Sequence, residues 1–91
     1  MPFKFVGNGE FIVSGFNPDF VNKDNTHLIE VYYTYFKEKV YGSIENYEKK
    51  RFAIFRKNGF KTLFFTEKEL HLSKEREVVD KINAFLKEKK N

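Results

Sequence analysis

The fold is decided by the stretch Asn17-Pro-Asp-Phe-Val-Asn-Lys-Asp-Asn-Thr-His-Leu-Ile-Glu-Val-Tyr32, in which two apolar runs flank a polar turn. Apolar runs rich in Val, Ile and aromatic residues favour strands, so this stretch predicts a hairpin of strands 19–22 and 27–36. With Asp24-Asn25 at the tip, Asp19 lies opposite Glu30. Side chains alternate along a strand. One face then carries Phe20, Ile29, Val31 and Tyr33, and the other carries Asp19, Leu28, Glu30 and Tyr32.

The opposed acids Asp19 and Glu30 are the most informative feature of this hairpin. Two carboxylates directly across a sheet repel each other, and burial strengthens the repulsion. A shared proton, a nearby cation or a divalent metal bound by both groups would compensate. Mg²⁺ suits the last case, because it takes one or two carboxylates and leaves its other positions for water and phosphate oxygens. The alternative is an exposed sheet rim on which both acids are solvated, and the sequence leaves both interpretations open.

The segments around this hairpin predict the rest of the fold. We expect a hairpin of strands 3–6 and 10–14 around Gly7-Asn8-Gly9, a helix over 44–57 between Ser43 and Asn58-Gly59, a strand over 60–66, and a last helix capped by Ser73. Segment 67–72 is ambiguous. The order β-β-β-β-α-β-α predicts an α+β fold with a mixed sheet, in which strands 27–36 and 60–66 run parallel through a right-handed crossover. A Pleckstrin-like β-sandwich would require a strand at 44–57, against its cap and its periodicity.

Composition narrows the class of protein. The chain has 91 residues, which suits one domain over 1–91, and it has no cysteine and two histidines. This excludes disulfides, cysteine zinc sites and thiol catalysis, and no apolar run or leader predicts a membrane span or secretion. The net charge is +4, and the window 37–61 holds eight basic and three acidic residues. Such a window suits a polyanionic partner, but on charge alone a solvated lysine-rich helix is the simpler explanation.

Three segments carry a resemblance to a known family. Pro18-Asp19 followed by Ile29-Glu30-Val31 resembles the core of the PD-(D/E)XK nucleases. The segment 48–67, with its basic helix, glycine and apolar strand, is similar to the closing part of that core in the very-short-patch-repair-like branch. The lead-in 6–20 is similar to that of the phage homing endonucleases of the same branch. The resemblance covers roughly residues 6–86, and it implies a restriction-endonuclease-like core and a Mg²⁺- or Mn²⁺-dependent DNA endonuclease.

The resemblance also implies roles for individual residues. Asp19 and Glu30 match the two acidic metal ligands, and Arg51 matches a polar residue of the core helix that faces the site. The family's usual lysine, two residues after the second acid, is replaced here by Tyr32. Lys37 is our first choice for the missing basic group, and His27 is the second. The residues that complete the expected set are Glu10, as a substitute for an upstream glutamate, Lys49 and Lys50 on the DNA backbone, and Tyr32 and Tyr35 flanking the nucleic acid.

A second function stays open beside the nuclease. The chain is then a non-catalytic nucleic-acid-binding or protein-interaction domain on a degenerate nuclease fold. The carboxylate pair distinguishes the two functions. Convergence of Asp19 and Glu30 together with metal binding favours an enzyme, whereas divergence or a permanent ion pair with a lysine favours a binder. We expect a cytoplasmic protein of a bacterium or a phage-infected cell. Specificity would come from a partner or from a DNA-recognition domain outside this chain, and a homodimer would suit a site that cuts one strand at a time. The chain is then either the catalytic fragment of a longer protein or a minimal or decayed copy of the enzyme.

Overall fold

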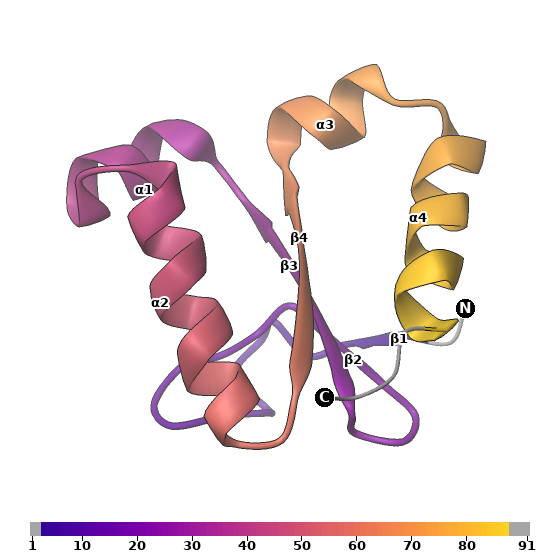
Figure 1. Ribbon diagram of the computed structural model, residues 1–91, viewed down its shortest axis with the longest axis horizontal. Coiled ribbons are helices and arrows are strands. Elements are labelled where there is room, and N and C mark those ends of the chain that lie inside the picture. Colours follow the sequence, from indigo (N-terminus) through magenta and orange to yellow (C-terminus); the bar gives the residue numbers. More distant parts are fainter. Residues whose placement is uncertain (1–2, 88–91) are drawn as a thin grey trace.

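The computed structural model describes residues 3–87, apart from the side chain of Phe36, and contains a four-stranded mixed sheet. The sheet has the order β1-β2-β3-β4, with strands Phe3–Phe5, Phe20–Asn22, His27–Tyr32 and Lys61–Thr66 (Figure 1). β1, β2 and β3 pair antiparallel, and β3 pairs parallel with β4. The helices are α1 (Thr34–Tyr41), α2 (Ile44–Lys57), α3 (Glu67–Leu72) and α4 (Glu75–Lys87). The predicted α+β class and the parallel pairing of β3 with β4 are confirmed.

The central hairpin has the predicted register, since Phe20 pairs with Ile29 and Val21 pairs with Leu28. Its turn is held by Asn22, whose Oδ1 accepts the backbone N–H groups of Thr26 at 2.9 Å and His27 at 2.8 Å. These bonds satisfy donors that the tight turn would otherwise leave unpaired. The register therefore places Asp19 and Glu30 side by side at the end of the hairpin away from the turn.

The predicted strand 27–36 is too long, because β3 ends at Tyr32 and α1 begins at Thr34. The cause lies far along the chain. The carboxylate of Glu67 accepts the N–H of Thr34 at 3.2 Å and its hydroxyl at 3.1 Å. A carboxylate at a helix N-terminus satisfies a free N–H group and interacts favourably with the helix dipole. This contact from α3 outweighs the strand propensity of the aromatic residues that follow Tyr32.

The predicted hairpin of strands 3–6 and 10–14 is wrong. β1 pairs with β2, with Phe3 opposite Asn22, and residues 10–14 form a loop with one isolated bridge between Val13 and Phe16. Asn17 explains the loop, because its Nδ2 donates to the carbonyls of Val6 at 2.7 Å and Phe11 at 2.8 Å. The Asn17 side chain thus links the two sides of the loop. The carbonyls of Val6 and Phe11 accept hydrogen bonds from Asn17 instead of from a neighbouring strand.

The caps of the helices agree in part with expectation. α2 spans Ile44–Lys57 as predicted, and the Ser43 hydroxyl accepts the N–H of Asn46 at 3.1 Å. The ambiguous segment 67–72 is α3, which begins with a capping box between Thr66 and Glu69. Ser73 does not start the last helix as predicted. It ends α3, because its N–H donates to the carbonyl of Glu69 at 2.9 Å.

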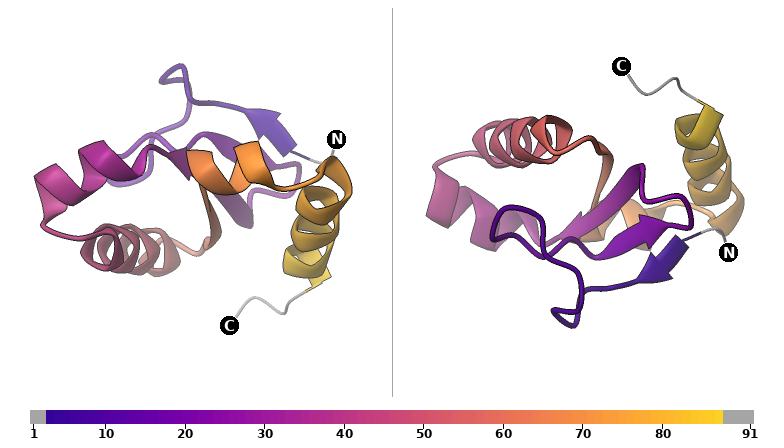
Figure 2. Two further views of the ribbon diagram at one scale, coloured as in Figure 1. Left: turned by 90° about the horizontal axis from the view of Figure 1, so that it is seen from above. Right: turned by 90° about the horizontal axis from the view of Figure 1, so that it is seen from below.

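Two apolar cores lie on opposite sides of the sheet. Leu28 and Ile29 are neighbours on β3 and point to opposite faces. Leu28 packs with Phe55 of α2, whereas Ile29 packs with Ile82 and Phe85 of α4. Figure 2 shows strands lying between α2 and α4. None of the helices within residues 3–87 is long and apolar enough to cross a membrane.

Candidate functional site

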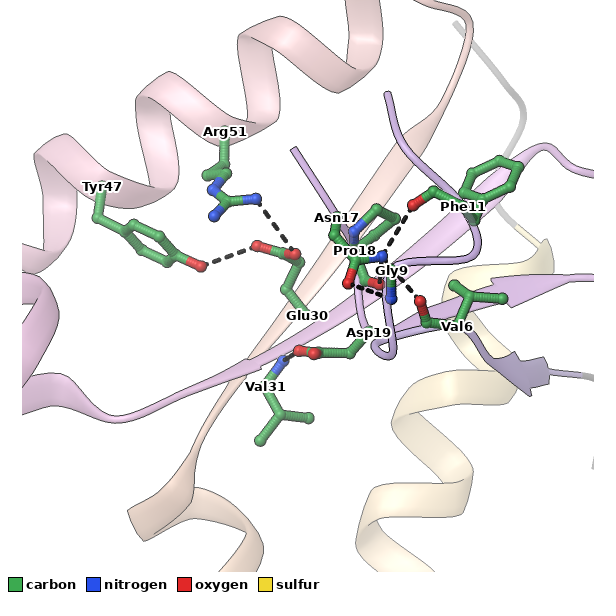
Figure 3. A network of polar contacts seen from close by, with 10 residues as sticks. All are labelled: Val6, Gly9, Phe11, Asn17, Pro18, Asp19, Glu30, Val31, Tyr47 and Arg51. Carbon is green, nitrogen blue, oxygen red and sulfur yellow. Dashed lines mark hydrogen bonds and ion pairs between the residues drawn. The ribbon is translucent and has the colours of Figure 1, made fainter. Parts of the chain in front are cut away.

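A pocket of about 260 Å³ opens where the hairpin of β2 and β3 meets α1 and α2. Asp19, Glu30, Lys37 and Arg51, which the sequence predicted as site residues, all line it, together with Asn17 and Tyr47. Figure 3 shows the polar contacts around the two acids. The hairpin supplies the acids, and the helical crossover from β3 to β4 supplies the basic side chains. The two carboxylates therefore converge on one pocket instead of lying on an exposed rim.

Asp19 is fixed by backbone groups on both sides. Its Oδ2 accepts the N–H of Val31 at 2.7 Å (Figure 3). Its backbone carbonyl accepts the N–H of Val6 at 2.7 Å. The neighbouring loop approaches closely at Gly7, where a Cβ atom would lie 3.2 Å from Oδ1 of Asp19. No described residue donates a hydrogen bond to Oδ1 of Asp19. One carboxylate oxygen thus orients the side chain, and the other is available to a ligand.

Glu30 lies deeper in the pocket, with only 3% of its surface exposed. The hydroxyl of Tyr47 donates to its Oε2 at 2.8 Å, and Nη1 of Arg51 lies 3.6 Å from its Oε1 (Figure 3). Burial raises the pKa of Glu30 above its ordinary value, although the charge of Arg51 and the Tyr47 hydrogen bond oppose the shift. The nearby carboxylate of Asp19 raises this pKa further, and the charge of Lys37 lowers it.

Arg51 points inward from α2, so its charged head lies in the interior and not in solvent. Its guanidinium carbon lies 4.4 Å from the ring centre of Phe16 and 5.9 Å from that of Phe55. The ion pair with Glu30 at 3.6 Å is longer than a hydrogen bond, and the buried Nε and Nη1 atoms have no hydrogen-bond partner within residues 3–87. A guanidinium that lines a pocket is suited to binding an anion such as a phosphate.

Lys37 reaches the same pocket from α1, and its Nζ lies 4.8 Å from the ring centre of Tyr47. His27, the second choice for the missing basic group, does not line the pocket. It lies at the opposite end of β3, where its Nδ1 is 2.7 Å from the Thr26 hydroxyl and its ring packs on Phe85. Of the two candidates, the structure brings only Lys37 to the acids.

Of the remaining predicted residues, one lines the pocket and the others lie on the surface. Glu10 is separate from the two acids and is paired with Lys4 at 3.4 Å on the surface. Tyr32 also lines the pocket, although it is only 2% exposed and its hydroxyl donates to Glu48, and its contact with nucleic acid stays a prediction. Three predicted nucleic-acid contacts are exposed around the crossover helices: Tyr35 on α1, and Lys49 and Lys50 on α2.

Sequence reasoning did not assign Tyr47 or Asn17 to the site, although both line the pocket. Tyr47 belongs to the apolar stripe of its helix by spacing, yet it stands one helical turn before Arg51 and on the same face. That spacing, on a helix predicted to cover the acids, is a signal that could have found it. In the sequence, Asn17 indicates only a break between two strands. Its multiple contacts could not be inferred, because they depend on the path of the loop.

The donor set fits one hard divalent cation. Within residues 3–87, no group of three or more His, Asp or Glu side chains could hold a metal. Two carboxylates are nevertheless sufficient for Mg²⁺ when water and phosphate oxygens complete its coordination. Oδ1 of Asp19 and Oε1 of Glu30 are the oxygens that short hydrogen bonds leave available. Comparisons of the chain with protein-family models, with curated proteins and with solved structures find no match.

Proposed function

We propose that the chain is a metal-dependent DNA endonuclease that hydrolyses phosphodiester bonds, as its resemblance to the PD-(D/E)XK nucleases implies. One observation carries the proposal. Two acids from adjacent strands and two cations from the crossover helices line the same open pocket: Asp19, Glu30, Lys37 and Arg51. Acidic ligands for a metal beside cations for a phosphate are the parts that phosphodiester hydrolysis requires.

The charge balance of the pocket supports this assignment. Two carboxylates offset the charges of Lys37 and Arg51, so the four side chains alone give a phosphate little net attraction. A divalent cation held by the carboxylates changes that balance to positive. The pocket then attracts the backbone of DNA, and the exposed lysines Lys49 and Lys50 add contacts that hold the backbone without reading its sequence.

Each side chain has a definite task in this mechanism. Asp19 and Glu30 hold the metal, which when bound polarises the phosphate and lowers the pKa of its water. Arg51, which lines the pocket, donates to a non-bridging phosphate oxygen. Lys37 offsets the charge that develops on the phosphate in the transition state. Lys37 thereby takes over from the family's motif lysine, whose position is occupied by Tyr32, bonded to Glu48.

The test is cleavage of supercoiled plasmid DNA with Mg²⁺ or Mn²⁺. We expect wild type to nick the plasmid, and we expect chelation by EDTA, Asp19→Asn and Glu30→Gln each to abolish nicking. Glu10→Gln is the matched control, because it removes an acid from the surface away from the pocket. Folding of every variant is checked by circular dichroism. Folded wild type that leaves DNA intact with both metals, or acid variants that cut as well as wild type, would contradict the proposal.

The alternative function is a non-catalytic nucleic-acid or protein binder. The observation that favours it is the contact set of Glu30, which already has Tyr47 and Arg51 as partners. In a binder, these contacts would be permanent and metal would add nothing. A gel shift without metal, unchanged by Asp19→Asn and accompanied by no cleavage, would support this function.

One pocket serves one strand at a time, so a double-strand cut would also require a second copy of the chain.

A further inference from the structure

Tyr47 contacts three of the four charged residues of the pocket. Its hydroxyl donates to Oε2 of Glu30 at 2.8 Å (Figure 3). The Nζ atom of Lys37 lies 4.8 Å from its ring centre, and the guanidinium carbon of Arg51 lies 5.6 Å from that centre. An aromatic face attracts cations at such distances. A single side chain from α2 thus meets an acid at its tip and cations at its ring.

The ring is held in place from several elements. Tyr47 is 2% exposed, and its ring centre lies 4.7 Å from that of Tyr32 on β3, 5.2 Å from Tyr41 on α1, and 6.1 Å from Phe64 on β4. A side chain packed on three sides cannot change rotamer without moving its neighbours. The direction of its hydroxyl toward Glu30 is therefore built into the packing of the crossover.

The donors of Arg51 bear on the role of the hydrogen bond between Tyr47 and Glu30. Within residues 3–87, Nε and Nη1 of Arg51 are buried without a hydrogen-bond partner, although Glu30 is only 3.6 Å away. Arginine and a carboxylate ordinarily close into a bidentate pair with two parallel hydrogen bonds. Such a pair would occupy both oxygens of Glu30. The contact of Tyr47 with Oε2 keeps that oxygen away from Arg51, and it leaves Oε1 in the looser contact.

We propose that Tyr47 is a positioning residue that keeps Glu30 from closing onto Arg51 and so keeps a carboxylate oxygen available for the metal. This inference rests on the proposed function, because it assigns Glu30 to a metal. The ring has a second task, which is to hold the Lys37 ammonium at the pocket. The two tasks belong to different atoms, so Tyr47→Phe removes the first and retains the second.

The experiment compares Tyr47→Phe with Tyr32→Phe. Both variants remove one hydroxyl from a buried tyrosine that donates to a glutamate, but Tyr32 donates to Glu48. Mn²⁺ affinity is measured by titration calorimetry on the full chain without DNA, after circular dichroism has shown each variant folded. We expect Tyr47→Phe to bind Mn²⁺ about 10- to 100-fold more weakly, as for other groups that orient a metal ligand. We expect Tyr32→Phe to bind it as wild type does.

A second readout needs neither metal nor activity. The Nε–H resonance of Arg51 in ¹⁵N-correlated spectra reports whether that group gains a hydrogen bond. In metal-free Tyr47→Phe we expect it to move to the position of a hydrogen-bonded guanidinium, and in Tyr32→Phe we expect no change. An unchanged resonance and an unchanged Mn²⁺ affinity in Tyr47→Phe would overturn the inference, as would equal losses in both variants. Wild type that binds Mn²⁺ but cuts no DNA would overturn the endonuclease alone.

Discussion

The carboxylate of Asp19 accepts the backbone N–H of Val31 at 2.7 Å, at the point where the ladder between β2 and β3 ends. β2 begins at Phe20, so this side chain extends the strand pairing by one more contact. Val31 directly follows Glu30. Consecutive residues of one strand therefore set the positions of both acids. The acid pair is held by backbone geometry rather than by flexible side chains.

Asp19→Asn is expected to separate chemistry from stability. The asparagine carbonyl still accepts the N–H of Val31, so we expect the free energy of unfolding to change by less than about 1 kcal/mol. Removal of a metal ligand should lower cleavage at least about 100-fold, which corresponds to roughly 2.7 kcal/mol in the barrier. Asp19→Ala also loses the backbone contact, and it should cost about 1–2 kcal/mol of stability. Urea unfolding and plasmid nicking measure the two effects, and Asp19→Asn with full activity would remove Asp19 from the mechanism.

Arg51→Met is expected to destabilise the fold strongly. The variant leaves Glu30 buried without its cation, and breaking such a pair typically costs about 3–5 kcal/mol. Adding Glu30→Gln removes the unpaired charge, so the double variant should recover most of the loss in urea unfolding. Arg56→Met is the control, because Arg56 is exposed on the same helix and should change stability by under about 0.5 kcal/mol. If Arg51→Met and Arg56→Met lower the free energy of unfolding by similar amounts, the ion pair between Arg51 and Glu30 makes no specific contribution to stability.

Lys49→Gln and Lys50→Gln are expected to weaken DNA binding equally for all sequences. If each lysine contacts one phosphate of duplex DNA, each variant lowers the slope of log K against log salt by about 0.9. Fluorescence anisotropy of a labelled duplex at several salt concentrations measures that slope. Lys23→Gln is the control, because Lys23 is exposed in the turn between β2 and β3. A slope that changes as much in Lys23→Gln would place the DNA on another surface.

Glu69 is expected to make stability depend on pH in the acid range. Burial disfavours its charge, but the hydrogen bond from Lys81, the Thr66 N–H and the Lys81 charge outweigh it and hold the pKa of Glu69 below its ordinary value of 4.5. A lowered pKa means that the unfolded chain binds the proton more readily. The contribution of Glu69 is therefore present above about pH 4.5 and is lost as the pH falls through the folded-state pKa.

Glu69→Gln should flatten that part of the profile of unfolding free energy against pH. The pair with Lys81 is partly exposed, so the expected difference at pH 7 is about 0.5 kcal/mol or less. Lys81→Met should flatten the same region, because it removes the partner from the other side. Urea unfolding between pH 3 and pH 7 provides the measurement. If the unfolding free energy of wild type changes with pH in parallel with that of both variants, the pair of Glu69 and Lys81 does not cause the pH dependence.

Local signals predicted the parts of the fold that local interactions form. The register of the central hairpin and the helix over 44–57 follow from a polar turn, alternation and a serine cap, and all three act within a few residues. The capping box of Thr66 and Glu69 is equally local, since its two members stand three residues apart, but segment 67–72 is ambiguous from the sequence and the box is not predicted. The hairpin signals also brought Asp19 and Glu30 together on one face.

The errors arose where distant residues decide. Glu67 caps α1 from the far side of the crossover, so the sequence around Thr34 alone suggested a longer strand. Asn17 gathers the loop that was predicted as the strand 10–14. The contact of Tyr47 with Glu30 likewise joins α2 to β3, and only the docked helix creates it. Propensity describes a segment by itself, whereas these contacts belong to the assembled fold.

The division of the pocket between hairpin and crossover has a consequence for folding kinetics. A hairpin closes over a short loop, whereas the parallel pairing of β3 with β4 must wait for α1 and α2 to cross over the sheet. We therefore expect the hairpin to bring Asp19 and Glu30 together before Arg51 can offset their charge. At neutral pH, repulsion between these two acids would then disfavour the early hairpin. We expect refolding to accelerate under mildly acidic conditions and Glu30→Gln to refold faster than wild type.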